Sequence, residues 1–316
     1  MAVLLVVLMY ALWSSVFSIA KLALAYSPPI FLTSFRMLLA AVFLLGFLAI
    51  TKRSSFRLSG KQLLSIGLLG IFSIYLTNIL EFWALQYLSA AKTCFIYSFS
   101  PFFAAFFSYL HFGERMNRRK WLGLSIGFLG MIPVLLMQTG AEDLLSIGNF
   151  LSWPTLAVVG AAMCSIYGWV LLRLAVKDQD MSPIMANGGS MLIGGLMALA
   201  HSSFTDSWNP LPVALENLGP FALWSLVIAF ISNIVCFNLY GMMLKKFTAT
   251  FLSFVGLLSP IFASLHGWLF LGEPLSWTIF ASTAIVCSGL WIVYSAELKQ
   301  GYIVSEKKKE PVGALS

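Results

Sequence analysis

Long apolar stretches recur along the whole chain, separated by short polar segments. Each stretch holds about 20 mainly apolar residues, the length that an α-helix needs to cross the ~30 Å hydrocarbon layer of a membrane. Apolar and polar positions do not alternate with a period of two, which excludes the strands of a membrane β-barrel. The pattern predicts an all-α integral membrane protein with ten transmembrane helices, at about 2–24, 30–51, 62–87, 90–111, 119–137, 150–174, 184–203, 219–243, 248–270 and 276–297.

The composition supports a membrane protein and excludes several other classes. Of the 316 residues, 59% are hydrophobic and 10% are Asp, Glu, Lys or Arg, against about 25% charged residues in a typical soluble domain. A single soluble core of this size could not bury so much apolar surface. This excludes a soluble enzyme, a nucleic-acid-binding protein, a disordered chain and a secreted scaffold. The four cysteines lie within apolar stretches and are predicted to be reduced packing residues rather than disulfide or zinc ligands.

The charged residues alternate in sign from one connecting segment to the next. Sixteen of the 19 basic residues lie in 52–61, 115–120, 173–177, 245–246 and 299–309, whereas the opposite segments carry Glu142, Asp143, Asp206, Glu216 and Glu273. Cytoplasmic loops of membrane proteins are rich in Lys and Arg, so we expect both termini in the cytoplasm and the protein in the cytoplasmic (inner) membrane. The first stretch has no early basic residue and is longer than a signal-peptide core, so we expect it to be retained. The net charge of +7 then needs no nucleic-acid partner.

An internal repeat relates the two halves of the chain at an offset of 159 residues. Ser100-Pro101 aligns with Ser259-Pro260, and Gly113-Glu114 aligns with Gly272-Glu273. Five helices are thus duplicated, and an odd number per half inverts the second copy in the membrane. Inverted repeats are typical of secondary transporters, which hold their substrate near the midplane. The predicted organisation is a first five-helix repeat at 1–137, an acidic extracytoplasmic linker at 138–149, a second repeat at 150–298 and a basic cytoplasmic tail at 299–316.

Several short motifs resemble those of one known family. They are WSSVF at 13–17 followed by Lys21, Pro28-Pro29 and Arg36, the segment WALQYLSA at 83–90, and the spacings of Pro101 to Glu114 and Pro260 to Glu273. On these motifs the chain resembles the drug/metabolite transporter superfamily, EamA type. The resemblance implies two inverted five-helix repeats around a central cavity, and secondary transport of small organic molecules by alternating access. Known substrate classes of that family include amino acids, amines, sugar phosphates, nucleotides and S-adenosylmethionine. Ser14 stands where the family usually has Gly, and Glu81 is not general to the family.

Four charged residues lie inside predicted spans, all in the outer half of the first repeat: Lys21, Arg36, Glu81 and Lys92. Such residues cost roughly 2.5–3.5 kcal/mol on insertion scales, so they usually have a partner or a function. Lys21 and Lys92 either reach the outer headgroups or bind substrate. Arg36 either makes a structural pair with Glu81 or a helix end, or binds a substrate carboxylate or phosphate. Glu81 pairs with Arg36, binds a cationic substrate group or takes up a coupling proton.

Polar and aromatic residues at helical spacing give further candidates. Tyr10, Ser14, Phe17 and Lys21 share one predicted helix face, as do Asn78 with Glu81, and Asn233 with Phe237 and Tyr240. The two asparagines either line a site or bond between helices. Aromatic rings, Trp83 among them, either face lipid or wall a cavity, where they suit a cation or a flat base. The predicted substrate-binding residues are Trp13, Ser14, Phe17, Lys21, Arg36, Asn78, Glu81, Tyr97, Asn233, Phe237, Tyr240 and Phe254.

Other features predict structural roles. Pro101 and Pro260 are predicted to bend equivalent helices near mid-span, as a gate or as a fixed kink. Glu114 and Glu273 are predicted to cap helix starts. Gly123, Gly127 and Gly130 indicate close helix packing, within the chain or in a homodimer.

The sequence contains no enzyme motif. It has no metal-ligand spacing of histidines, no phosphate-binding GK[ST] loop and no dinucleotide turn, so we expect neither a catalytic site nor a cofactor. The main prediction is a secondary transporter of a small amphoteric metabolite, with the bilayer, the substrate and a coupling proton or counter-substrate as partners, as a monomer or homodimer. Amino acids fit, and S-adenosylmethionine, with exchange as one mode of transport, fits the positive groups, the acid and the aromatic residues together. The alternatives are a proton-driven exporter of drugs or amino acids, with Glu81 as proton carrier, and a non-transporting receptor or scaffold.

Overall fold

The computed structural model describes residues 2–88, 93, 96–139, 152–271 and 276–303. Within these helices, the side chains of Phe17, Lys21 and a few other residues are also outside the description. All regular structure in the described ranges is helical, which confirms an all-α protein. Of the described helices, 7 are long and apolar enough to cross a membrane, namely Pro29–Thr51, Gly60–Leu85, Trp153–Asp178, Pro183–Thr205, Leu215–Met243, Ala249–His266 and Trp277–Gln300, and Ala2–Val16 is a shorter apolar helix.

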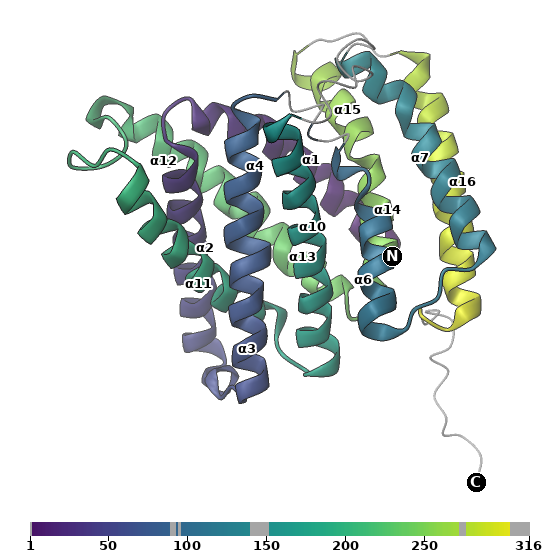
Figure 1. The fold of residues 1–316 in the computed structure, drawn as a ribbon, viewed down its shortest axis with the longest axis horizontal. Helices are drawn as coiled ribbons and strands as arrows, with labels where there is room; N and C mark the ends of the chain where they lie inside the picture. The colour runs from purple at the N-terminus through teal and green to yellow at the C-terminus, as the bar shows by residue number, and fades with distance from the viewer. Residues whose placement is uncertain (1, 89–92, 94–95, 140–151, 272–275, 304–316) are drawn as a thin grey trace.

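The helices run along the bundle and are joined by short connections (Figure 1). In the first half they are α1 (Ala2–Leu24), α2 (Pro29–Thr51), η1 (Arg53–Phe56), a continuous helix formed by α3 (Gly60–Leu69), η2 (Gly70–Leu76) and α4 (Thr77–Leu85), then α6 (Ser100–Phe112) and α7 (Arg118–Thr139). In the second half they are α10 (Trp153–Arg173) with η3 (Leu174–Asp178), α11 (Pro183–Thr205), η4 (Leu215–Asn217), α12 (Leu218–Ile228), η5 (Ala229–Cys236), α13 (Phe237–Met243), α14 (Ala249–Val255), η6 (Gly256–Leu258), α15 (Ser259–Leu271) and α16 (Trp277–Gln300).

Local sequence signals set several helix ends. Ser59 and Gln62 form a reciprocal capping box at the start of α3, and the Thr248 hydroxyl accepts from the backbone N–H of Phe251 at the start of α14. Such caps satisfy backbone donors that the first turn of a helix leaves unpaired. Gly113 and Gly301 end α6 and α16 in the left-handed conformation, with φ of 63° and 76°, which glycine adopts without a steric penalty.

Two wide π-helical turns lie 159 residues apart, at the offset of the sequence repeat. They are η2, which begins at Gly70, and η5, which begins at Ala229. An asparagine follows each one and donates its side-chain amide to two carbonyls of the turn: Asn78 to Ser73 and Ile74 at 3.4 and 2.7 Å, and Asn238 to Asn233 and Ile234 at 3.4 and 2.8 Å. The two halves therefore use the same device, although the asparagines are 160 residues apart because η5 is one residue longer than η2. Such turns are frequent at functional sites.

The prolines differ from the prediction of a bend within a helix. Pro101 and Pro260 are each the second residue of a helix, in α6 and α15, and both helices begin with serine. In the second half, α14 ends at Val255 and the short turn η6 separates it from α15. Proline is favoured in the first turn of a helix because its missing N–H has no partner there anyway. Each proline thus lies in the first turn of an α-helical segment, and in the second half η6 joins that segment to α14 within one span, Ala249–His266.

Glycines allow close packing at the α7–α16 contact, where the two helices lie side by side at the right of Figure 1. A Cβ atom on Gly123 would lie 2.8 Å from the carbonyl oxygen of Gly289, and one on Gly289 would lie 2.6 Å from the carbonyl oxygen of Gly123. Gly127 packs on the ring of Phe254, and Gly130 packs on Ile285. The prediction of packing within the chain is therefore confirmed for all three glycines of α7.

A cluster of buried ion pairs joins helix ends at the lower end of the bundle, where α6 and α16 end and α7 begins in Figure 1. Arg173 pairs with Glu114 at 2.5 Å, and Lys120 pairs with Glu297 at 3.0 Å, with all four side chains at most 5% exposed. Thr248 donates its hydroxyl to Glu297 at 2.7 Å. We call Glu114, Lys120, Arg173 and Glu297 the paired cluster.

The paired cluster corrects the prediction that Glu114 caps a helix. The side chain of Asn117 accepts from the backbone N–H of Lys120 and caps α7 instead, while Glu114 is turned inward to Arg173. Lys120 and Arg173, which the charge pattern groups with loop residues, belong to the first turn of α7 and the last turn of α10. Glu273, the other predicted cap, lies outside the described residues.

Candidate substrate cavity

A cavity of about 160 Å³ lies between helices of both halves. Its lining includes residues of α1, α2, η2, α4, α10, η5, α13, α14 and α15. A concave site that is mostly apolar and carries a few polar groups is typical of small-molecule binding sites. Among the described residues, its lining contains two charged residues, several aromatic rings and a set of hydroxyls, and each group comes from particular helices.

Arg36 is the positive charge among the described residues of the cavity lining. It lies in α2 and is 2% exposed. Its guanidinium donates to the side-chain oxygen of Asn233 at 3.3 Å and to that of Asn78, and it lies 4.7 Å from the ring centre of Phe82. Its Nε has no hydrogen-bond partner in the described part of the chain. The two asparagines hold the guanidinium in place without an ion pair in direct contact, and Glu81 acts on it electrostatically from a longer distance. A buried charge without a counter-ion in contact is costly. The site therefore favours an anionic ligand group.

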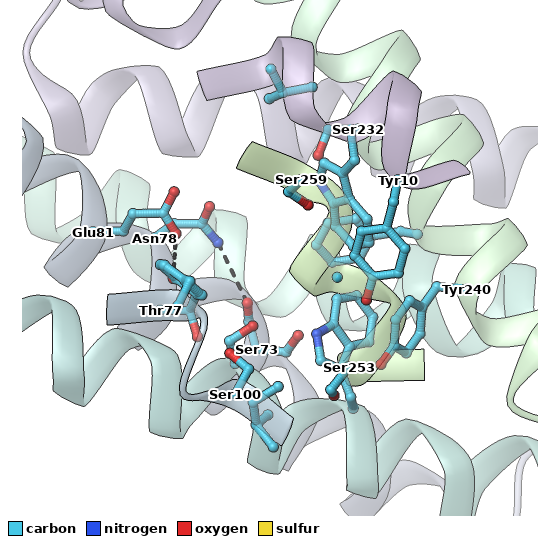
Figure 2. A pocket seen from close by; sticks show the side chains of 18 of the residues that line it. Tyr10, Ser73, Thr77, Asn78, Glu81, Ser100, Ser232, Tyr240, Ser253 and Ser259 are labelled. Carbon is cyan, nitrogen blue, oxygen red and sulfur yellow. Dashed lines mark hydrogen bonds between the residues drawn. The ribbon is translucent and has the colours of Figure 1, made fainter. Parts of the chain in front are cut away.

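Glu81 is the negative charge among the described residues of that lining. It lies on α4 three residues after Asn78, and both side chains face the cavity (Figure 2), as their helical spacing predicts. The hydroxyl of Tyr97 donates to Oε2 of Glu81 at 2.5 Å. The described ion pairs, at a limit of 4.0 Å, include neither Glu81 nor Arg36. Of the alternatives for these two residues, a direct Arg36–Glu81 ion pair within 4.0 Å is therefore not among the described contacts, although the two charges interact electrostatically. We call Arg36 and Glu81 the cavity charges.

An aromatic wall closes the other side of the cavity. Trp13 contacts four rings, with centroid distances of 6.0 Å to Tyr10, 5.6 Å to Trp169, 5.4 Å to Phe237 and 6.0 Å to Tyr240. The ring centroids of Trp169 and Tyr240 are 4.2 Å apart. In Figure 2, Tyr10 and Tyr240 lie on the side opposite Glu81 and Asn78. The cavity thus has an ionic side and an aromatic side, and aromatic faces suit a flat base or a cation.

Hydroxyl groups lie between the two sides. Figure 2 shows Ser73, Ser100, Ser253 and Ser259 between Glu81 and the two tyrosines. Serine hydroxyls both donate and accept hydrogen bonds. They can therefore bind polar groups in the middle of a ligand whose two ends differ in character.

The structure places most of the predicted binding residues at this cavity. Trp13, Arg36, Asn78, Glu81, Tyr97, Phe237, Tyr240 and the predicted hinge residue Pro260 line it. Asn233 does not line it but holds Arg36. The side chains of Phe17 and Lys21, and the whole of Lys92, lie outside the described residues.

Four candidates lie elsewhere. The hydroxyl of Ser14 donates to the carbonyl of Ala11 at 2.8 Å and lies 3.4 Å from His266, so it faces α15. Phe254 is fully buried against Gly127, where it fills the space that the glycine leaves. Trp83 is 39% exposed and packs on Tyr87. Pro101 is buried at the start of α6 without lining the cavity.

The sequence patterns missed other lining residues. Tyr10 was on the predicted inward face, but Trp169 carried no signal because aromatic residues are 15% of the chain. The serines had a signal in the repeat. Ser73 and Ser232, and likewise Ser100 and Ser259, are 159 residues apart, and all four line the cavity. Polar residues that recur at the repeat offset would have identified them.

Residues 1–136 and 152–295 match the EamA-like transporter family. A protein of Chlamydia muridarum named S-adenosylmethionine/S-adenosylhomocysteine transporter is 42% identical over 308 residues, which cover 97% of this chain and 96% of that protein. A protein of Chlamydia trachomatis serovar L2 with the same name is 41% identical, covering 97% and 93%. A crystal structure with 16% identity superposes with a TM-score of 0.75 over 95% of this chain and 98% of that one, which shows a shared fold.

Proposed function

The chain belongs to the EamA-like transporter family, and from this premise we propose that it carries S-adenosylmethionine and S-adenosylhomocysteine across the cytoplasmic membrane. It is a transporter and not an enzyme. The relatives that carry these substrates in their names match 97% of the chain. The observation that carries the proposal is the cavity itself, which combines a buried arginine without a direct ion pair, a carboxylate and an aromatic wall.

Each substrate, like the cavity, has an ionic end, a polar middle and an aromatic end. Each has an amino-acid end with a carboxylate and an ammonium group, a ribose in the middle and a flat adenine at the other end. In the proposed binding mode, Arg36 binds the carboxylate, for which a guanidinium is geometrically suited. Adenine stacks on the aromatic wall around Trp13, and the serine hydroxyls bind the ribose. Lys21 and Phe17 remain proposed binding residues on the first helix.

We propose the transport fold as ten helices in two inverted five-helix repeats, at 1–137 and 150–298. Three facts support it: the family match falls in two parts, the π-helical turns begin 159 residues apart, and so do α6 and α15. Transport then proceeds by alternating access, with the helix breaks before Pro101 and Pro260 as hinges. Inverted repeats provide such exchange of openings around one central site.

The proposed orientation has both termini in the cytoplasm and rests on the alternating loop charges. The paired cluster then lies at the cytoplasmic end of the bundle, because Glu114 follows α6 and Lys120 begins α7 next to the basic segment at 115–120. Arg36 and Glu81 lie toward the opposite end of their helices. In this arrangement the paired cluster closes the cytoplasmic side of the cavity.

The test is a ligand panel on purified protein in detergent, followed by transport in proteoliposomes. We expect S-adenosylmethionine and S-adenosylhomocysteine to raise the unfolding temperature and methionine or adenosine alone to raise it less. Labelled S-adenosylmethionine is expected to enter liposomes loaded with S-adenosylhomocysteine faster than empty ones, without an imposed proton gradient. Uptake that requires a proton gradient and ignores the internal load would favour the proton-driven exporter. Absence of any thermal shift with either compound would contradict the proposed substrates.

A further inference from the structure

We propose that Glu81 determines how strongly the cavity prefers S-adenosylmethionine, which carries a cationic sulfonium, over S-adenosylhomocysteine, which carries a neutral thioether. This inference rests on the proposed function and assigns a selectivity to one residue of the same site. Arg36 and Glu81 are the charged residues among the described residues of its lining, and they are not paired with each other.

The two substrates differ by one charge. S-adenosylmethionine has one carboxylate and two cations, the ammonium and the sulfonium, whereas S-adenosylhomocysteine has one carboxylate and one cation. With the carboxylate at Arg36, both substrates leave an ammonium to be neutralised, and S-adenosylmethionine leaves the sulfonium as well. Glu81 is the acid in the described lining that can meet these positive charges.

The position of Glu81 suits the cations and not the carboxylate. Asn78, which holds the Arg36 guanidinium, and Glu81 are three residues apart on α4, so their Cβ atoms are about 5–6 Å apart along the cavity wall. In the substrate, the ammonium lies on the carbon next to the carboxylate and the sulfonium lies three bonds beyond that carbon. A substrate anchored at Arg36 therefore extends its cations along the wall toward Glu81.

Tyr97 fixes the carboxylate in this position. Its hydroxyl donates to Oε2 of Glu81 at 2.5 Å, which leaves Oε1 for the substrate. Tyr97 also lines the cavity, so it acts as a positioning residue through Glu81. A carboxylate that is fixed before the ligand arrives loses less conformational entropy when it binds a cation.

The size of the effect follows from Coulomb's law. At the effective dielectric of about 20 that suits protein sites, two unit charges about 5–6 Å apart interact strongly enough to change a dissociation constant by tenfold or more. The Glu81 carboxylate makes this interaction with two cations in one substrate and with one cation in the other. Removing its charge therefore raises the Kd of both substrates, and it raises the Kd of S-adenosylmethionine about tenfold more than that of S-adenosylhomocysteine.

The experiment measures the Kd of both compounds for the full-length protein in detergent. Glu81→Gln is expected to lower the ratio of affinities, S-adenosylmethionine to S-adenosylhomocysteine, by about tenfold, and Glu81→Asp, which keeps the charge, is expected to preserve most of that ratio. Glu216→Gln is the matched control, because Glu216 lies on the exposed turn η4 and the same change there should alter neither affinity.

The outcomes separate this inference from the proposed function. If the wild-type protein binds both compounds and Glu81→Gln weakens them by the same factor, the substrates stand and the role of Glu81 is refuted. If the wild-type protein binds neither compound, both proposals fall.

Should Glu81→Gln not fold, the wild-type protein still provides a test with an analogue whose sulfonium is replaced by a carbon that bears an ammonium group. The inference predicts a Kd near that of S-adenosylmethionine. A Kd near that of S-adenosylhomocysteine would overturn it.

Discussion

The protein buries charge in two regions, and it treats the charge differently in each. In the paired cluster, Lys120 meets Glu297 at 3.0 Å and Arg173 meets Glu114 at 2.5 Å. In the cavity, Arg36 is held by neutral amide oxygens and Glu81 by a tyrosine hydroxyl. The charges of the paired cluster meet in direct ion pairs, whereas the cavity charges interact only at longer range and each keeps its direct contacts to neutral groups. The comparison teaches that burial alone does not mark a charge as a candidate for function, and that a buried charge without a direct ionic contact beside a cavity is the better candidate.

The two regions also differ in what they connect. The paired cluster joins helix ends that are far apart in the sequence, since Glu114 follows α6 and Arg173 ends α10, while Lys120 begins α7 and Glu297 lies in the last turn of α16. The cavity charges instead lie on α2 and α4, inside the bundle. The first arrangement fixes helices relative to one another, and the second leaves charge available to a substrate.

The largest expected effect is the loss of one partner in the paired cluster. Glu297→Gln leaves Lys120 as a buried charge without a counter-ion, which costs about 3–5 kcal/mol. We expect a large fall in the unfolding temperature in detergent, measured by intrinsic fluorescence. The double variant Lys120→Met with Glu297→Leu should recover most of the loss, because apolar residues of similar size can replace a buried pair.

The matched control for that prediction is an exposed pair. Lys245 lies 3.9 Å from Asp180, with the two side chains 41% and 99% exposed, and exposed pairs contribute little to stability. Lys245→Met should leave the unfolding temperature unchanged. If Glu297→Gln behaves in the same way, the paired cluster is not what holds these helix ends together.

The next effect concerns binding rather than stability. Arg36→Ala removes the group proposed to bind the substrate carboxylate, and we expect a loss of about 2 kcal/mol or more, roughly 30-fold in Kd for S-adenosylmethionine. Adenosine, which has no carboxylate, should bind to this variant as it does to the wild type. Because Arg36 makes no direct ion pair, and its electrostatic interaction with Glu81 acts over a longer distance, its removal should destabilise the protein less than Glu297→Gln does. Equal losses for adenosine and S-adenosylmethionine would mean that the whole cavity has collapsed.

A smaller effect separates the two sides of the cavity. Trp13→Leu keeps an apolar side chain but removes the ring at the centre of the aromatic wall. We expect a loss of about 1 kcal/mol, roughly fivefold in Kd, for both substrates and for adenosine alike. Isothermal titration of the three ligands measures it. A selective loss of only one of the two substrates would place adenine elsewhere.

The smallest effect is on the positioning of Glu81. Tyr97→Phe removes one hydroxyl and keeps the ring, so the carboxylate retains its charge but loses its fixed position. We expect the affinity ratio of S-adenosylmethionine to S-adenosylhomocysteine to fall by about two- to threefold, less than for Glu81→Gln. A larger shift than that of Glu81→Gln would show that Tyr97 contacts the substrate itself.

Much of the fold could be predicted from the sequence because long apolar stretches have one stable form in a membrane, the α-helix. The cavity charges were also predictable, since Arg36 and Glu81 lie within apolar stretches, where a charged side chain is costly and usually has a partner or a function. Hydrophobic periodicity alone could not show which helices of the second half pack around Arg36 and Glu81. Trp169 belongs to the aromatic wall, but no sequence pattern predicted it, and Phe254, which was predicted to bind substrate, packs against Gly127 instead.

The paired cluster was not predictable for a different reason. Lys120, Arg173 and Glu114 lie at helix ends, where a sequence pattern cannot distinguish a buried side chain from a loop charge. Glu297 lies in the last turn of α16 and pairs with a residue 177 positions earlier in the chain. Such a contact depends on how helices pack, which hydrophobic periodicity does not encode. The prolines show the same limit, because only the backbone reveals that Pro101 and Pro260 begin helices.

The most direct test of the central claim, that Arg36 serves a substrate and not the fold, is an exchange measurement. Wild-type protein and Arg36→Ala are reconstituted at equal amounts into liposomes loaded with S-adenosylhomocysteine, and the entry of labelled S-adenosylmethionine is followed. With the labelled substrate near the wild-type Kd, we expect rapid, saturable exchange for the wild type and, for a variant that is folded by its unfolding temperature, entry at least about tenfold slower. Exchange at the wild-type rate by Arg36→Ala would contradict that claim.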